Sequence, residues 1–444
     1  MPQGSPSVEP SASRRTAREN SKLLGNALVV SIAVFAVNAS NFVFQVGTGR
    51  LLSSEEYGLL LSAFTLLALL SVASSAIMTA VSKREAMKIA VEQPVAASVD
   101  QGGLWLRFTL ALSELRRDRL AMIAVQIGLV GGLVMCLAAP LVADFLHSGI
   151  EVALALAASV PTICTTAVIY GRLQGQQRFQ LFAVISLAVA MVKLTLGLGA
   201  VATGRGTAAV LVVVAIATLL ATIWGLLVVR EPGPSGLRAL SPEILRILVV
   251  LVCWRAIIGM DVPLARFWLT DRVAGQYAAA VVIGRGVLWL PEIVSFVMFP
   301  AMASAVAQGK STRQELIRAI ALTLSLCLLG ALALWALGPV IFDLLYGSEY
   351  PQAAGLSWKV ALSSIPTAAA NLLMFAALAR RESGWIVMLV SAALIQVGLL
   401  ALFHRNPQQL VLGSAVGGIL TLAITFRAAT RPTSSVPDSS LVGA

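Results

Sequence analysis

Long apolar runs separated by short polar connections make up most of the chain. The runs are about 20 residues or longer, which is the length that an α-helix needs to cross the roughly 30 Å hydrocarbon core of a bilayer. They lie at about 24–48, 59–81, 120–146, 150–170, 180–203, 207–229, 244–269, 274–305, 315–342, 352–379, 384–403 and 409–427. The pattern predicts an all-α polytopic membrane protein with twelve transmembrane helices.

The polar segments predict the domain boundaries. Residues 1–22 form a polar tail that we expect to be disordered, and the Pro/Gly-rich segment 231–243 separates two halves. We therefore expect a six-helix lobe at 23–230, a cytoplasmic linker at 231–243, a second six-helix lobe at 244–429 and a tail at 430–444. The basic connection 82–119 is the longest; it is either a solvated loop or in part an amphipathic surface helix.

The two halves resemble each other. Pro140 and Asp144 match Pro339 and Asp343 at the same offset of 199 residues, and the turns that follow the first and seventh runs share a pattern of Arg, Ser/Thr, acidic residues and Gly. Two pseudo-symmetric lobes of this kind commonly enclose a substrate site between them. We expect the two aspartates to act mainly as structural caps or interfacial groups.

The distribution of positive charge predicts the topology. Of the 32 Lys and Arg residues, 23 fall in the tails and connections on one side, four on the other side and five within spans. Cytoplasmic loops carry the excess of Lys and Arg, so both termini are predicted to lie in the cytoplasm. The protein itself is predicted to lie in the cell membrane. The net charge of +11 thus reports topology, and no nucleic-acid partner is expected.

No sequence motif for covalent chemistry stands out. The chain has no GxxxxGK[ST], GxSxG or HExxH motif, no CxxC pair and only two histidines. The external connections are short, whereas an integral-membrane polymerase or ligase needs a large loop for its chemistry. We therefore expect a transporter rather than an enzyme, with no cofactor and no metal site.

Charged residues inside the apolar runs are the candidate functional residues. Each such charge costs roughly 2.5–3.5 kcal/mol at the bilayer centre, so the groups are expected to face a wet path or a partner. A net-positive path attracts an anion such as a diphosphate, and Arg suits bidentate phosphate contacts. The predicted anion contacts are Lys193, Arg255, Arg266, Arg285 and Lys359, and the candidates for ion or proton coupling are Asp261 and Glu292.

Helical geometry refines these assignments. On one continuous helix Arg255 and Arg266 share a stripe, and Asp261 points about 120–140° away, which makes it a poor partner for both. Arg285 and Glu292 lie on one face, about 10 Å apart along the axis. The alternative for the arginines is snorkelling or structural pairing, and for the lysines an ion pair or an interface anchor. Helix breaks are expected at the prolines inside spans, which are Pro161, Pro263, Pro291, Pro300 and Pro366.

Several segments resemble one known family. They are GRLLSSEEYGLLLSAF after the first run, GRLQGQQRF at 171–179, DVPLARFWLTDRVAGQYAAA at 261–280 with the following Phe299-Pro300, and YGSEY at 346–350. Their order and spacing, over about residues 22–430, are similar to Wzx-type polysaccharide (O-antigen) flippases of the MOP (multidrug/oligosaccharidyl-lipid/polysaccharide) superfamily.

The resemblance implies a V-shaped bundle of two six-helix lobes, as in MATE-like transporters. It also implies transfer of an undecaprenyl-diphosphate-linked glycan from the cytoplasmic to the outer leaflet, with membrane lipid and polysaccharide polymerase or export proteins as further partners. Asp261, Gly275 and Tyr277 match most directly, as structural or coupling positions. The lipid II flippase branch usually has fourteen helices, so twelve runs favour the Wzx-type branch.

Two other functions stay open, one a transporter and one not. A multidrug or cation antiporter of the same superfamily needs a cavity with more acid than base, and the spans show the reverse. A non-transporting membrane scaffold would recruit partners through the 82–119 connection.

Overall fold

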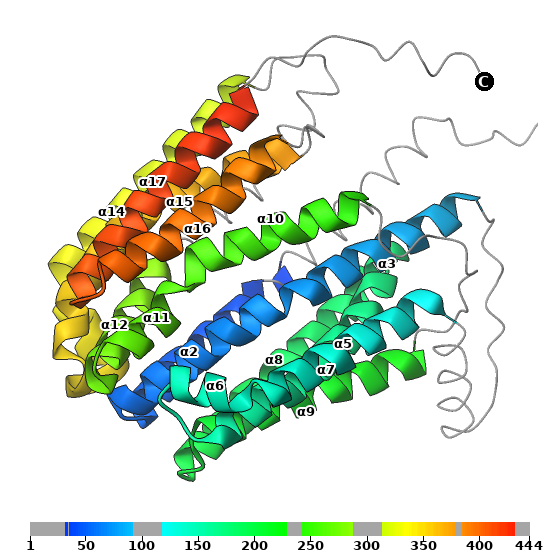
Figure 1. Cartoon of the computed structure of the whole chain (residues 1–444), viewed down its shortest axis with the longest axis horizontal. Helices are drawn as coiled ribbons and strands as arrows, with labels where there is room; N and C mark the ends of the chain where they lie inside the picture. Colours follow the sequence, from blue (N-terminus) through cyan, green and yellow to red (C-terminus); the bar gives the residue numbers. More distant parts are fainter. Residues whose placement is uncertain are drawn as a thin grey trace, which may run out of the picture. The chain divides into compact units, whose positions relative to one another are not determined.

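The computed structural model describes residues 32–33, 35–91, 118–228, 242–286, 313–378 and 384–430, and almost all of them are helical. A helix covers residues 35–51. The further helices are α2 (Ser54–Leu70), α3 (Val72–Val91), α5 (Arg119–Leu137), α6 (Ala139–Phe145), α7 (Ile150–Gly175), α8 (Phe179–Ala202), α9 (Gly206–Val228), α10 (Pro242–Gly259), α11 (Asp261–Trp268), α12 (Asp271–Gly286), α14 (Arg313–Tyr346), the short 3-10 helix η1 (Gly347–Glu349), α15 (Pro351–Leu378), α16 (Gly384–Leu402) and α17 (Pro407–Thr430). Figure 1 shows their course in sequence colours.

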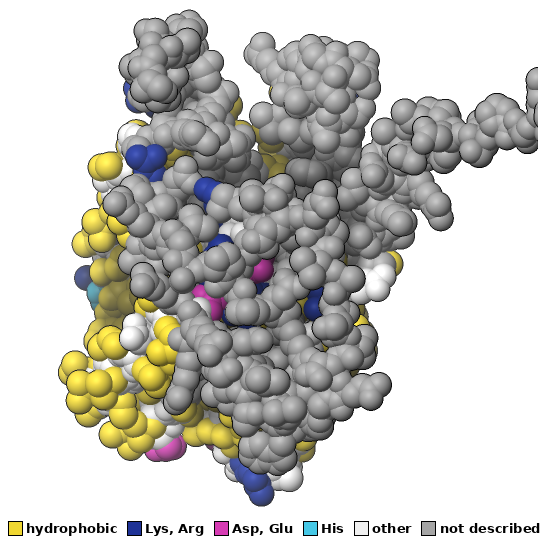
Figure 2. Space-filling view, turned by 90° about the vertical axis from the view of Figure 1, so that its right-hand side faces the viewer, with side chains coloured by type: hydrophobic (Ala, Val, Ile, Leu, Met, Phe, Trp, Pro, Cys, Tyr) yellow, Lys and Arg dark blue, Asp and Glu magenta, His cyan; other side chains and the backbone are white. Residues whose placement is uncertain are grey.

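Many of these helices have the length and the apolar composition that a membrane-spanning helix needs. Within the described residues, seven helices are long and apolar enough to cross a bilayer, or nine if each of two bent pairs counts as one span. Their lipid-facing sides are visible as apolar exposure: Trp335 of α14 is 64% exposed, and Leu133 of α5 is 60% exposed. Hydrophobic side chains also cover most of the described surface on the left of Figure 2. The chain is a multi-pass membrane protein, and the count of twelve helices stays a prediction.

The chain forms two compact units. Unit 1 comprises Met1–Leu51, Leu70–Asp144 and Ser148–Leu245, and unit 2 comprises Leu52–Leu69, Phe145–His147 and Arg246–Ala444. The unit boundary near residue 245 lies close to the expected linker, most of which is outside the described residues. The predicted domain limits therefore stay a prediction.

In unit 1, α7 is the central helix and packs against α3, α5 and α9. Its contact with α9 is partly polar. Thr166 and Thr222 share a hydroxyl hydrogen bond of 2.8 Å, and the Thr218 hydroxyl donates to Thr162 at 2.8 Å. Such bonds between helices satisfy hydroxyl groups that have no water to bind inside a membrane.

In unit 2, α15 holds the corresponding position and packs against α12, α14 and α17. The helices α12, α14 and α17 lie in the second, third and sixth apolar runs of the second half. The helices α3, α5 and α9, which contact α7, lie in the second, third and sixth runs of the first half. The matching neighbours agree with the internal repeat that the sequence predicts.

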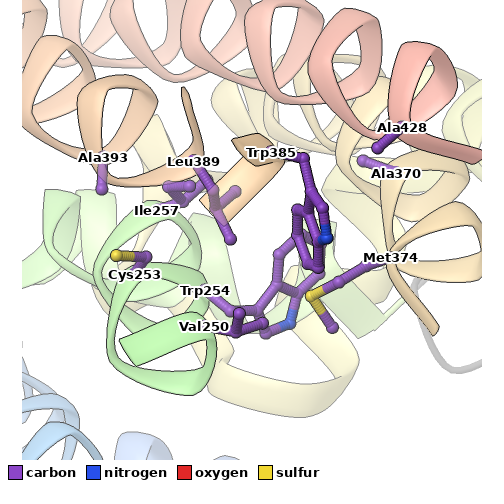
Figure 3. Packing of buried hydrophobic residues seen from close by; sticks show 10 residues of the cluster. All are labelled: Val250, Cys253, Trp254, Ile257, Ala370, Met374, Trp385, Leu389, Ala393 and Ala428. Atoms are coloured by element: carbon purple, nitrogen blue, oxygen red, sulfur yellow. The ribbon is translucent and has the colours of Figure 1, made fainter. Parts of the chain in front are cut away.

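The core of unit 2 includes a cluster around two tryptophans (Figure 3). Trp254 of α10 and Trp385 of α16 lie with Met374 of α15 and Leu389 of α16, and all four are buried. Large aromatic side chains bury more apolar area than any other type. The cluster thereby fixes α10, and with it Arg255, against α15 and α16.

Contrary to the prediction from the sequence, not every proline inside an apolar run breaks its helix. The helices α7 and α15 continue through Pro161 and Pro366, so the expected breaks there are wrong. The 120–146 run bends by 63° between α5 and α6, just before Pro140, whereas its counterpart Pro339 lies inside the continuous α14. Pro291 and Pro300 lie outside the described residues.

Candidate functional site

The bend between α10 and α11 positions the first candidate group. The two helices meet at 48°. Pro263 has no N–H, and its ring crowds the carbonyl four residues earlier, which is that of Gly259, the last residue of α10. The break predicted at Pro263 is confirmed. Because of it, Arg255 and Arg266 do not share a stripe of one straight helix. Asp261 becomes the first residue of α11.

Asp261 pairs with Arg285 of α12. An Nη2 nitrogen of Arg285 lies 2.6 Å from Oδ2 of Asp261, and the Tyr277 hydroxyl donates to the same oxygen at 2.5 Å. Oδ1 of Asp261 has no hydrogen-bond partner among the described residues. The carboxylate is 1% exposed and the Arg285 side chain 17% exposed. Sequence geometry paired Arg285 with Glu292 instead, and Glu292 lies outside the described residues.

Arg266, a predicted anion contact, has a different environment. It is 3% exposed and donates from Nε to the Leu146 carbonyl at 3.0 Å and from Nη1 to the Glu55 carbonyl at 2.9 Å. Its Nη2 lies 3.0 Å from Asp271. Because these donors are already occupied, Arg266 fits a structural role that joins three turns of unit 2. We therefore leave it out of the proposed anion contacts.

Lys193 lies on α8 in unit 1. Its ammonium donates to Oδ1 of Asn41, in the helix 35–51, and sits 5.1 Å from the centre of the Phe44 ring. An amide oxygen and an aromatic face both stabilise a cation without neutralising it. Neither of these two contacts is an ion pair with a carboxylate.

Arg255 and Lys359 are the remaining predicted contacts, both in unit 2. Arg255 is exposed and Lys359 is half-buried on α15, with its ammonium 5.6 Å from the Trp358 ring centre. Among the described residues neither forms an ion pair. Five span cations were predicted; the structure pairs two of them with carboxylates, Arg266 with Asp271 and Arg285 with Asp261.

Sequence reasoning missed a buried ionic cluster in unit 1. Asp118, directly before α5, accepts from Nη1 and Nη2 of Arg84 at 2.6 and 2.7 Å and from Nη2 of Arg172 at 2.7 Å. Glu85 lies 3.0 Å from Arg84, and all four side chains are buried. The sequence predicted Arg84 in the basic connection 82–119, either a solvated loop or in part an amphipathic surface helix, and Arg172 in the segment 171–179 that resembles the flippase family. Glu85 follows Arg84 directly and was the available signal, whereas Asp118 is 34 residues from Arg84 and 54 from Arg172.

Comparisons with known proteins bear on the fold. No family model matches the chain, and no curated protein sequence matches it. Solved structures do match. A lipid II flippase, MurJ, in an inward closed conformation is 14% identical with a TM-score of 0.64, over 91% of this chain and 88% of that one. An inward-facing multidrug resistance MATE family transporter of the MOP superfamily is 16% identical with a TM-score of 0.57, over 90% and 96%.

The fold is that of the MOP-superfamily transporters. A further match, a MOP superfamily transporter from Pyrococcus furiosus, is 13% identical with a TM-score of 0.54 over 90% of this chain and 94% of that one. At these identities the likeness establishes the MOP fold alone. The membrane-transporter fold that the sequence predicted is confirmed, and the Wzx-type branch stays a prediction.

Proposed function

We propose that this protein translocates a polyprenyl-diphosphate-linked oligosaccharide from the cytoplasmic to the outer leaflet of the cell membrane. The observation that carries the proposal is the positive charge of two groups in the apolar runs that the sequence predicts to span the membrane: Arg255 and Lys359 have no acidic partner in the described structure. A cation at that depth is expensive, and an anionic substrate repays part of the cost. A diphosphate is an anion that a membrane lipid carries at its head group.

Two further basic groups complete the proposed anion contacts. Lys193 of unit 1 lies beside Asn41 and Phe44, and Arg285 of unit 2 is partly exposed. Arg presents several N–H donors in a planar fork that matches phosphate oxygens, whereas Lys acts as a point charge. Asp261 is the proposed coupling group; Glu292 remains a candidate that lies outside the described residues.

The known folds support a transporter and leave its substrate to be proposed. One match is a lipid II flippase and another a multidrug MATE transporter, so both substrate classes occur on this fold. For the P. furiosus transporter, reverse polarity of the binding pocket suggests a different function. A drug-cation substrate would be repelled by Arg255 and Lys359, which favours the anionic lipid here. The segments that resemble Wzx-type flippases favour a glycan-bearing lipid as substrate. The distribution of Lys and Arg favours both termini in the cytoplasm.

A deletion strain tests this function in cells. We expect loss of the protein to cause accumulation of lipid-linked sugars in the cytoplasmic leaflet, detected by mass analysis of extracted lipids and by resistance to external enzymes. A plasmid copy of the wild type should reverse the accumulation, as should Arg205→Gln, which changes an exposed arginine between α8 and α9. Arg255→Gln should not. An unchanged pool of lipid-linked sugars in the deletion strain would contradict the proposal.

A further inference from the structure

The ion pair of Asp261 and Arg285 is asymmetric. The carboxylate is 1% exposed, whereas the Arg285 side chain is 17% exposed and joined to it through a single nitrogen. Guanidinium groups have five N–H donors, and this is the one hydrogen bond that the described residues give Arg285. The paired group therefore keeps donors free on a side chain that solvent or a ligand can reach.

The ionic cluster of unit 1 shows what a purely structural pair looks like in the same chain. Arg172 and Asp118 are 2% and 1% exposed, and Asp118 accepts from two arginines with both of its oxygens. Asp261 accepts through Oδ2 alone, and its Oδ1 has no partner among the described residues. Arg285 contacts its aspartate through one nitrogen, as Arg172 does, whereas Arg84 uses two. It differs from both arginines of the unit 1 cluster in exposure, at 17% against 4% for Arg84 and 2% for Arg172.

We propose that Asp261 is an internal competitor for Arg285, and that the substrate's phosphate displaces it. This inference rests on the proposed function, and it assigns to Asp261 the regulation of the anion contact that Arg285 makes. In the free protein Arg285 lies on Asp261; on binding, its N–H donors pass to phosphate oxygens. Carboxylate and phosphate both accept charge-assisted hydrogen bonds from a guanidinium, so the exchange replaces one ionic bond by another.

The exchange explains why the carboxylate carries a second donor. When Arg285 leaves, Asp261 keeps the hydrogen bond from Tyr277, which limits the cost of a buried and unpaired charge. The vacated position beside Asp261 is then where a coupling cation would enter. Competition of this type lowers the apparent affinity for the anion by the fraction of time that Arg285 is free.

A binding measurement on the purified full-length chain in detergent tests the competition directly. The probe is farnesyl diphosphate, a short prenyl diphosphate, and farnesol is its uncharged control. If Arg285 lies on Asp261 about nine-tenths of the time, freeing it tightens the apparent Kd about tenfold. We therefore expect Asp261→Asn to bind the diphosphate more tightly than the wild type by roughly that factor, and Asp261→Asn/Arg285→Gln to lose the gain.

Two hydroxyl variants keep the test decisive if Asp261→Asn does not fold. Tyr277→Phe removes the second donor to Asp261, holds Arg285 there more tightly and should weaken binding several-fold. Its matched control, Tyr346→Phe, removes a buried hydroxyl that bonds to Tyr57 at 3.1 Å and should leave the Kd unchanged. Equal affinity of folded Asp261→Asn and wild type, or no effect of Tyr277→Phe, overturns the competition. Failure of the wild type to prefer the diphosphate over farnesol overturns the proposed function as well.

Discussion

Asp118 and Arg172 are 54 residues apart in the chain, yet their side chains meet at 2.7 Å with both groups buried. Arg84 binds the same carboxylate. The cluster joins α3, the start of α5 and α7, which is the central helix of unit 1. Among the described residues the two arginines meet two carboxylates, Asp118 and Glu85, which fits a role in holding three helices together.

Neutralising Asp118 should destabilise unit 1. Asp118→Asn leaves two buried guanidinium groups with the single carboxylate of Glu85, and breaking a buried pair by removing one partner costs about 3–5 kcal/mol. Chemical unfolding in detergent measures the loss of unfolding free energy. The control is Asp144→Asn, an exposed aspartate at the end of α6, which should change the free energy by less than about 0.5 kcal/mol. Equal effects of the two substitutions would contradict the structural role.

The same carboxylate should make stability depend on pH in the acid range. Burial acts to raise the pKa of Asp118, but hydrogen bonds from Arg84 and Arg172 and their charges outweigh it, so the pKa lies well below its ordinary value. The stabilisation is therefore fully present above the unfolded-state pKa of about 3.9 and is lost as the pH falls further. Unfolding free energy measured from pH 7 down to pH 2 should fall more steeply below about pH 4 in the wild type than in Asp118→Asn. Parallel curves would argue against the pairing.

Gly275 marks a close contact between α12 and the start of α2. A Cβ atom there would overlap the backbone carbonyl of Ser54, and a Cβ at Gly58 would lie 2.9 Å from the backbone of Gly275. Backbone atoms cannot move aside as a flexible side chain can, so Gly275→Ala should strongly lower the thermal stability. Gly355→Ala, at a helix position with nothing within 4 Å, should not lower it. If both variants unfold at the wild-type temperature, the α2–α12 contact is not as described.

Arg266 should matter for stability and not for anion binding. Arg266→Ala removes the donor to the carbonyl of buried Leu146, and a buried unsatisfied group costs about 1–3 kcal/mol. We expect a lower unfolding temperature together with an unchanged affinity for farnesyl diphosphate in the fraction that remains folded. Arg255→Gln is the matched comparison and should show the opposite result: near-normal stability and weaker binding. Weaker binding by folded Arg266→Ala would restore Arg266 to the anion contacts.

The helical class and the repeat were predictable because both depend on patterns within the sequence. Apolar runs of spanning length fix the helix type, and matching Pro and Asp positions in the two halves indicated the repeat. Charge partners were less predictable, because ion pairs join residues from different helices. Asp261 was assigned no partner on its own helix, and the structure supplies one from α12. The contacts of Arg266 could not be predicted, because its acceptors include two backbone carbonyls, which leave no trace in side-chain patterns.

Proline positions show a second limit. Pro161, Pro263 and Pro366 all lie in apolar runs, yet among these three only Pro263 follows a bend. Neighbouring helices can satisfy the carbonyl that a proline leaves without its N–H, and packing around a central helix such as α7 or α15 decides whether it continues. That packing depends on the tertiary structure and is not encoded at the proline itself.

Transbilayer movement of a defined lipid is the decisive measurement. Proteoliposomes containing the purified chain and a fluorescent polyprenyl-diphosphate oligosaccharide report how much lipid becomes accessible to an external quencher over time. We expect wild type and Arg205→Gln to move the lipid at similar rates, and Arg255→Gln and Arg285→Gln to slow it at least tenfold while remaining folded. Transport by both variants at the wild-type rate, or equal transport of a neutral lipid without the diphosphate, would contradict an anion-guided flippase.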